Sequence, residues 1–166
     1  MSLLCFSIPP VLSKGLVLSV KRYFVISKMG AHAKPMANVR YIEPIELSSM
    51  MNYLKINKDY SIIDVRDADF IGGNIVGAIN VPSQYFHNHK AGLAEKLSSV
   101  PKVIFHCALS QERGPKCARI YHSYLTEVAQ GKELSDDFIQ EVMILRGGFT
   151  AWQTLFSKDS ALTEKI

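Results

Sequence analysis

Short apolar runs alternate with segments of helical spacing from residue 39 onward, and this alternation predicts a sheet covered by helices. Five runs rich in β-branched and aromatic residues are expected to be strands, at residues 39–42, 61–65, 79–81, 103–105 and 142–145. Four segments with apolar residues three or four positions apart are expected to be helices, at residues 44–55, 84–98, 119–128 and 150–156. Strands that alternate with helices form mainly parallel sheets with helices on both faces. The predicted fold is therefore α/β, with a mainly parallel five-stranded central sheet.

Residues 1–36 differ from the rest of the chain in charge. They carry five of the 19 lysines and arginines and no acidic residue, which leaves 14 basic against 15 acidic residues in 37–166. The positive charge therefore belongs to this leader and does not indicate a nucleic-acid-binding surface. We interpret 1–36 as a disordered or alternative-start extension before a single domain at 37–166. A mitochondrial presequence is the alternative, because the leader is basic, acid-free and contains serine.

The apolar runs of the leader are too short to cross a bilayer. Pro9-Pro10 and Lys21-Arg22 interrupt them before they reach the roughly 18 to 20 residues that a spanning helix needs. The three cysteines are an odd number without a framework spacing, which favours a reducing compartment over a disulfide scaffold. We expect a cytoplasmic protein, with access to the nucleus, that has no stable membrane insertion. A functional presequence would instead place it in the mitochondrion.

The stretch from His106 to Pro115 lies between the predicted central strand and the helix that follows it. It reads His-Cys, five residues, then Arg-Gly-Pro. We predict that these ten residues form a strand-to-helix loop, with Cys107 at its start and the N–H groups of residues 110–113 directed inward. Amides at a helix N-terminus, together with the helix dipole, favour anions. The loop is therefore predicted to be an oxyanion cradle.

Cys107 and Arg113 are the residues of this loop that can act on a bound oxyanion. A cysteine near a cation and a helix N-terminus more readily forms the thiolate that attacks. Arg113 can offer two parallel N–H groups to two oxygens. A cysteine after an apolar strand is, by itself, more often a small core residue. The full pattern nevertheless favours a nucleophile that faces a tetrahedral oxyanion such as phosphate.

Three further segments, together with this loop, resemble the rhodanese superfamily. They are Ile-Ile-Asp-Val-Arg at 62–66, the glycine-containing run at 72–82, and Leu-Arg-Gly-Gly-Phe-Thr-Ala-Trp at 145–152. Sulfurtransferases of that superfamily typically have four residues between the cysteine and the basic residue that closes the loop, whereas five intervene here. The loop resembles that of the M-phase inducer-type dual-specificity phosphatases. It is more similar still to that of small fungal and plant relatives, which act as phosphatases, arsenate reductases or both.

The resemblance implies a role for each residue of the loop. Cys107 matches the nucleophile and Arg113 the oxyanion-binding arginine. The phosphate-binding backbone corresponds to Ala108, Leu109, Ser110, Gln111 and Glu112. Glu112 also matches an acid that is proposed to influence proton transfer, so it is either the general acid or a carboxylate that stabilises the loop. Supporting roles are expected for His106, which would bond the loop backbone, and for Asp64 and Arg66, which would pair at a strand end.

The function implied is that of a cysteine-dependent protein phosphatase, tyrosine-specific or dual-specific, with a phosphocysteine intermediate. The alternative is an arsenate reductase that uses the same cysteine, with glutathione and glutaredoxin as the reductant. A sulfurtransferase or a rhodanese-like binding module is a more remote alternative. The expected substrate is a phosphoprotein or a small oxyanion, phosphate or arsenate. We expect no metal, no other cofactor and no nucleic-acid partner.

Cys117 is a second cysteine near the predicted nucleophile. Val65 stands where the cell-cycle phosphatases carry a back-up cysteine, so Cys117 is a candidate replacement. However, Cys117 shares one helical stripe with apolar and aromatic residues, namely Tyr121, Tyr124, Leu125 and Val128. This spacing favours core packing. No cysteine follows Cys117, so the zinc site of some plant relatives is not expected here.

Overall fold

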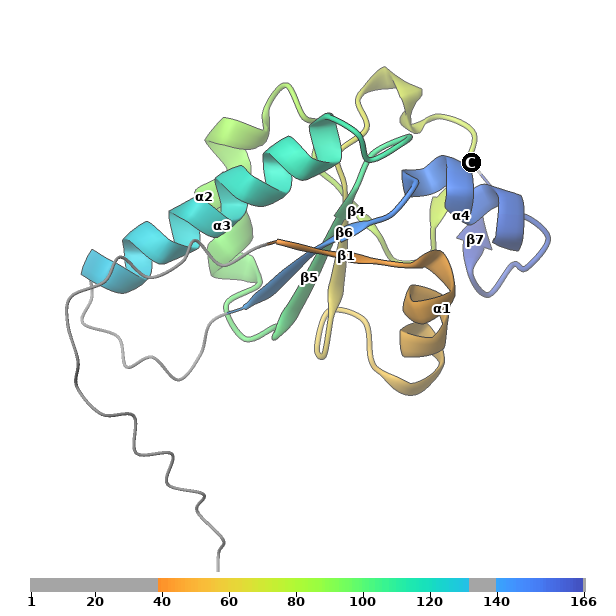
Figure 1. Ribbon diagram of the computed structural model, residues 1–166, viewed down its shortest axis with the longest axis horizontal. Coiled ribbons are helices and arrows are strands. Elements are labelled where there is room, and N and C mark those ends of the chain that lie inside the picture. Colours follow the sequence, from red (N-terminus) through yellow and green to blue (C-terminus); the bar gives the residue numbers. More distant parts are fainter. Residues whose placement is uncertain (1–38, 132–139, 166) are drawn as a thin grey trace, which may run out of the picture. The chain divides into compact units, whose positions relative to one another are not determined.

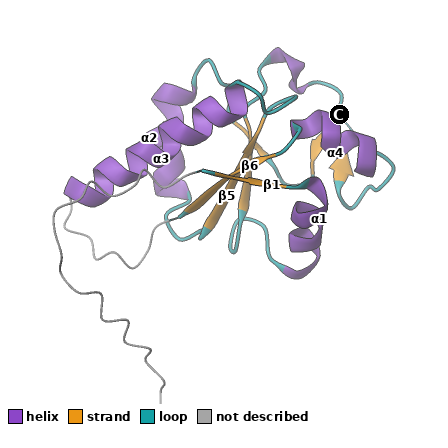
Figure 2. Ribbon diagram, in the orientation of Figure 1, coloured by secondary structure: helices purple, strands orange, loops and turns teal. Residues whose placement is uncertain are grey.

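The secondary structure follows the predicted alternation of strands and helices (Figures 1 and 2). The structure is a computed structural model that describes residues 39–131 and 140–165. Its elements are β1 (Arg40–Ile42), α1 (Pro44–Tyr53), β2 (Ser61–Asp64), the 3₁₀ turn η1 (Ala68–Phe70), β3 (Asn74–Ile75), β4 (Ile79–Asn80), α2 (Phe86–Lys96), β5 (Lys102–His106), α3 (Arg113–Gly131), β6 (Glu141–Leu145), α4 (Gly148–Phe156) and β7 (Thr163–Glu164). The predicted leader lies outside the described residues, so the domain boundary at residue 37 stays a prediction.

The central sheet has five strands in the order β1-β6-β5-β2-β4, and all four neighbouring pairs are parallel. The predicted five-stranded parallel sheet is therefore confirmed. After β2 the chain moves toward the β4 edge, whereas after β5 it moves toward the β1 edge. The carboxyl ends of β2 and β5 thus lie side by side at a topological switch point, where open α/β sheets bind their ligands.

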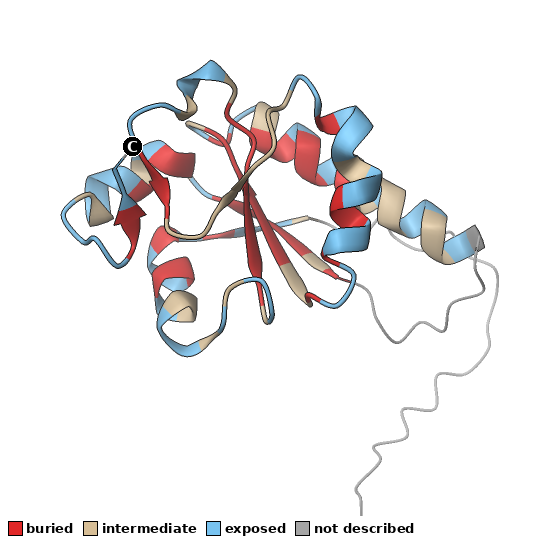
Figure 3. Ribbon diagram, turned by 180° about the vertical axis from the view of Figure 1, so that it is seen from behind, coloured by how far each residue is buried: buried red, intermediate tan, exposed pale blue. Residues whose placement is uncertain are grey.

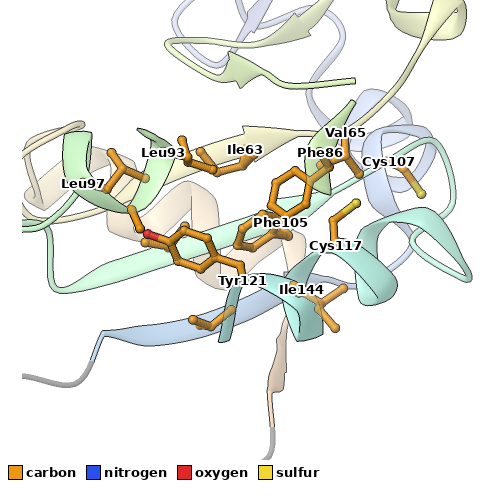
Figure 4. Close-up of a cluster of buried hydrophobic side chains, with 14 of the residues drawn as sticks. Ile63, Val65, Phe86, Leu93, Leu97, Phe105, Cys107, Cys117, Tyr121 and Ile144 are labelled. Carbon is orange, nitrogen blue, oxygen red and sulfur yellow. The ribbon is translucent and has the colours of Figure 1, made fainter. Parts of the chain in front are cut away.

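Helices cover both faces of the sheet, and most of the buried surface lies along its strands (Figures 1 and 3). On the face covered by α2 and α3, the ring of Phe105 packs against Phe86 and Tyr121, with centroids 5.7 and 5.4 Å apart (Figure 4). On the face covered by α1 and α4, Trp152 is fully buried and its Nε1 donates to Thr163 Oγ1 at 3.0 Å. The site loops are therefore carried by a sheet that is packed from both sides.

The loop that contains Cys107 is shorter than the sequence predicted. Helix α3 begins at Arg113, so only residues 107–112 connect it to β5, and the prediction of a ten-residue loop was wrong. Pro115, the last residue of the predicted loop, lies in the first turn of α3. A missing N–H costs little there, because the first four helical N–H groups have no intrahelical partner. The short strands β3 and β7 were also not predicted.

The cysteine of α3 packs in the core as its spacing predicted. Cys117 is 2% exposed and belongs to the same buried cluster as Phe105 and Tyr121 (Figure 4). Tyr124 and Leu125 are partly buried against that cluster. Burial raises the pKa of the Cys117 thiol to about 12, so this cysteine is protonated at neutral pH.

Candidate active site

Two loops meet at the switch point of the sheet, one after β5 and one after β2. Cys107 comes directly after β5, and residues 107–112 lead from it into α3. The loop after β2 carries Asp67 and Asp69, and both of their carboxylates contact the side chain of Arg113. These contacts join the two loops into one site.

Ser110 turns the middle of the β5–α3 loop toward the sulfur of Cys107. Its φ of 51° is in the left-handed region, which is uncommon for residues other than glycine. The Ser110 N–H donates to Cys107 Sγ at 3.2 Å, and its Oγ accepts from the Cys107 N–H at 3.4 Å. Ser110 is 4% exposed, whereas Leu109 is 50% exposed. A backbone amide of the loop is therefore directed at the predicted nucleophile.

Helix α4 supports the loop from its other side. The N–H groups of Phe149 and Thr150 donate to the carbonyl oxygens of Cys107 and Ala108, each at 2.9 Å. Gly148 makes this approach feasible, because a Cβ at this position would collide with both oxygens. In a trans peptide the N–H points opposite to the carbonyl. The N–H groups of Ala108 and Leu109 therefore point away from α4.

The predicted supporting residues lie beneath the loop. Asp64 and Arg66 are 0% and 2% exposed and pair at the end of β2, with Arg66 Nη2 2.6 Å from Asp64 Oδ2. His106 Nδ1 lies 3.3 Å from the carbonyl oxygen of Cys107, and its Nε2 lies 3.6 Å from Asp64 Oδ2. Burial lowers the pKa of His106, although the charge of Asp64 opposes this. His106 thus contacts the loop backbone, and its role in function stays a prediction.

Arg66 also fixes the loop that follows β2. Its Nη2 donates to the carbonyl oxygen of Gly73 at 2.8 Å, and its Nη1 donates to that of Asp69 at 3.4 Å. Its guanidinium carbon lies 4.0 Å from the ring centroid of Phe149. A buried cation therefore ties the segment that carries the aspartates to the start of α4.

Arg113 is the first residue of α3, and two carboxylates hold its guanidinium. Nη1 and Nη2 donate to Asp69 Oδ1 and Oδ2 at 2.7 and 2.6 Å, and Nη1 also donates to Asp67 Oδ2 at 3.0 Å. The sequence predicted that Arg113 would close the loop opposite Cys107, and it did not reveal these partners. Hydrogen bonding with Asp69 raises the pKa of Arg113, burial opposes this, and the hydrogen bond to Asp67 adds to the rise.

The same contacts keep both aspartates charged. The hydrogen bonds from Arg113 lower the pKa of Asp69 to about 2. Burial raises the pKa of Asp67, but hydrogen bonds from Arg113 and Ser83 outweigh it, so the net shift is downward. Neither carboxylate is therefore a proton donor at neutral pH.

Glu112 and Gln111 lie at the exposed rim of the loop. Among the described residues, the Glu112 carboxylate makes no hydrogen bond or ion pair that would stabilise the loop, and only its backbone carbonyl accepts a bond, from Lys116. Its role in proton transfer stays a prediction. Within residues 39–131 and 140–165, no three His, Cys, Asp or Glu side chains are grouped so that they could hold a metal ion.

The sequence and the fold match a known family. The rhodanese-like domain family matches residues 44–155, so the chain belongs to it. The CDC25-like phosphatase YCH1 of Saccharomyces cerevisiae is 32% identical over 139 residues, which cover 76% of this chain and 89% of that protein. Arsenate reductase 2.2 of Oryza sativa subsp. japonica is 32% identical over 116 residues, 69% of this chain and 82% of that protein. The predicted branch, of CDC25-like phosphatases and arsenate reductases, is thereby confirmed.

A solved structure agrees with this assignment. The crystal structure of Ygr203w from Saccharomyces cerevisiae is described as that of a homolog of single-domain rhodanese and the Cdc25 phosphatase catalytic domain. It aligns with a TM-score of 0.60 and 29% identity, over 78% of this chain and 89% of that one. The rhodanese-like fold is therefore established by topology and by comparison.

Two parts of the site were missed by reasoning from the sequence. Asp67 and Asp69 directly follow a buried strand, and the carboxyl ends of neighbouring parallel strands meet at one edge of a sheet. That signal could have placed them near Arg113. Nothing in the local sequence reveals that Gly148 contacts a loop 40 residues away.

Proposed function

We propose that this chain is a cysteine-dependent protein phosphatase that acts through a phosphocysteine intermediate. The observation that carries the proposal is the 3.2 Å hydrogen bond from the Ser110 amide to Cys107 Sγ. In the proposed reaction this amide belongs to the loop whose N–H groups stabilise the negative charge that develops on the phosphoryl oxygens. The similarity to phosphatases across most of the chain supports the same reaction.

The reaction proceeds in two displacements. The Cys107 thiolate attacks phosphorus, so that an S–P bond forms while the P–O ester bond breaks and the leaving oxygen takes a proton. Loop amides and the guanidinium of Arg113 stabilise the charge on the other phosphoryl oxygens. Water then hydrolyses the phosphocysteine, which releases inorganic phosphate and restores the thiolate. Glu112, at the exposed rim of the loop, is the predicted acid for the first step.

Arsenate reduction is the second candidate, favoured by the similarity to arsenate reductases at comparable identity. Arsenate and phosphate share tetrahedral shape and charge, so the same cradle fits both. Cys107 would attack arsenic and displace water. Two electrons from glutathione, with glutaredoxin, would then reduce arsenate to arsenite and regenerate the cysteine. A sulfurtransferase is disfavoured by the five residues between Cys107 and Arg113.

Two assays on the same protein separate these activities. Hydrolysis of p-nitrophenyl phosphate is measured beside arsenate reduction with glutathione, glutaredoxin and glutathione reductase. Cys107→Ser is expected to abolish both, because a serine hydroxyl does not ionise at neutral pH. Cys117→Ala, a change at the buried cysteine, is the matched control and should retain turnover. Unchanged hydrolysis by the serine variant would remove the proposed mechanism.

The proposed substrates are phosphoproteins or small oxyanions, and the proposed compartment is the cytoplasm, with access to the nucleus. No helix in the described ranges combines the length and apolar character that crossing a bilayer requires. Fluorescence microscopy of the full chain tagged at its C-terminus would test the compartment. A signal confined to mitochondria would instead identify the leader as a presequence.

A further inference from the structure

The contacts of Arg113 occupy one edge of its guanidinium and leave another available. A guanidinium has five N–H donors, two on each Nη and one on Nε. Both donors of Nη1 and one donor of Nη2 are taken by Asp67 and Asp69. The Nε donor and the second Nη2 donor have no partner among the described residues. These two N–H groups are parallel and lie on one edge, which is the arrangement that binds two oxygens of a phosphate.

The two carboxylates are themselves held in place. Asp67 Oδ2 accepts from Ser83 Oγ at 2.8 Å, and its Oδ1 accepts from the Gln84 N–H at 3.2 Å. Asp69 Oδ1 also accepts from the Asp67 N–H at 3.0 Å. The backbone carbonyl of Asp69 is in turn fixed by the buried Arg66. The acceptors that bind Arg113 are therefore anchored to the loop before α2 and to the core.

We propose that Asp67 and Asp69 are positioning residues for the oxyanion site. They bind the Nη1–Nη2 end of Arg113, so that the Nε–Nη2 edge is presented to the substrate. This inference rests on the proposed function, in which Arg113 binds the oxyanion. An arginine that rotates freely loses rotamer freedom when it binds a ligand, whereas a clamped one has already lost it. The pairing of Arg113 with Asp67 and Asp69, which we call the clamp, therefore increases affinity for the oxyanion and for the transition state.

A competing effect has the opposite sign. Arg113, Asp67 and Asp69 together carry a net charge of −1, which repels a dianionic substrate. If repulsion dominated, the carboxylates would act as an internal competitor for the arginine. The distribution of contacts favours positioning, because the aspartates leave one complete two-donor edge unoccupied. The two effects predict opposite changes in oxyanion affinity when a carboxylate is removed.

The experiment compares Asp69→Ala with wild type, using tungstate as a non-hydrolysed oxyanion. We expect the dissociation constant for tungstate, measured by calorimetry, to rise about tenfold, the equivalent of ~1.4 kcal/mol. The value of kcat/KM for p-nitrophenyl phosphate should fall by a similar factor. Asp69→Glu, which keeps the carboxylate, should recover part of both. Glu46→Ala is the matched control, because it removes a comparably exposed carboxylate that pairs with Arg40 on the edge strand β1.

A structural readout separates failure of the clamp from failure of the proposed function. In wild type without ligand, the two carboxylates should restrict rotation of the Arg113 guanidinium, so its Nη–H resonances should be resolved and slow to exchange, and Asp69→Ala should broaden them. Tungstate binding to Asp69→Ala that equals or exceeds that of wild type would overturn the positioning role. A mobile Arg113 in wild type would overturn it as well. If wild type neither hydrolyses p-nitrophenyl phosphate nor binds tungstate, the proposed function fails, even where the resonances show that Asp67 and Asp69 hold Arg113.

Discussion

Replacement of Gly148 by alanine tests how the loop that contains Cys107 is held. Gly148 has a φ of +60°, and an added Cβ would meet the carbonyl oxygens of Cys107 and Ala108, with the carbonyl carbon of Ala108 at 2.8 Å. These contacts are to backbone atoms, which cannot rotate away. Helix α4 or the loop must therefore shift.

The cost can be estimated from the contacts at risk. A shift would break the hydrogen bonds from Phe149 and Thr150 to the loop, each contributing about 1 kcal/mol. The left-handed backbone adds about 1–2 kcal/mol for a residue with a Cβ. We therefore expect Gly148→Ala to lose about 3–4 kcal/mol of unfolding free energy. Turnover should fall more steeply than stability, because the carbonyls that move belong to Cys107, the predicted nucleophile, and to its neighbour Ala108.

Urea unfolding followed by circular dichroism, together with hydrolysis of an aryl phosphate, measures both effects. Gly92→Ala is the matched control, since Gly92 lies within α2 and an added Cβ would meet no atom within 4 Å beyond its chain neighbours and the backbone of its own helix. That variant should be stabilised by about 0.5–1 kcal/mol and keep full activity. If Gly148→Ala matched Gly92→Ala in stability and turnover, α4 could not be what holds the loop.

Two further predictions concern the charged groups around the site. Asp64→Asn leaves Arg66 buried without a carboxylate, so urea unfolding should show a loss of about 3–5 kcal/mol of unfolding free energy. Glu46→Gln, at an exposed ion pair, is the control. If Asp64→Asn had an effect as small as that of the control, the buried pair would have no stabilising role. Because the pKa of Asp69 falls from 3.8 to about 2 on folding, its pairing with Arg113 stabilises the protein above about pH 4 and is lost as the pH falls toward 2. The difference in unfolding free energy between wild type and Asp69→Asn should be constant near neutral pH and vanish at about pH 2; a difference independent of pH would contradict this linkage.

Local pattern was sufficient for most of the sheet and for the position of Cys107 at the end of its central strand. The strands β2, β5 and β6 are runs of apolar residues buried on both faces, and such runs need no long-range information to be recognised. Only His106 separates Cys107 from the apolar part of β5. The start of α3 was misjudged because Pro115 is compatible both with a loop and with the first turn of a helix.

Contacts between loops could not be predicted in the same way. The pairing of Asp69 with Arg113 joins residues 44 positions apart, and it depends on the strand order that brings β2 next to β5. The close approach of Gly148 to Cys107 depends on how α4 packs, and the sequence specifies only that a glycine is present. Residue types thus indicated the chemistry, whereas the partners of Arg113 required the three-dimensional arrangement.

The central claim is that the sulfur of Cys107 attacks an oxyanion held by the loop. Rapid acid quenching during turnover of an aryl phosphate, followed by mass spectrometry of peptides, tests it most directly. We predict a phosphoryl adduct on the peptide that contains Cys107, located on the sulfur and absent from Cys107→Ser. An adduct on another residue, or turnover without any adduct on Cys107, would contradict the account.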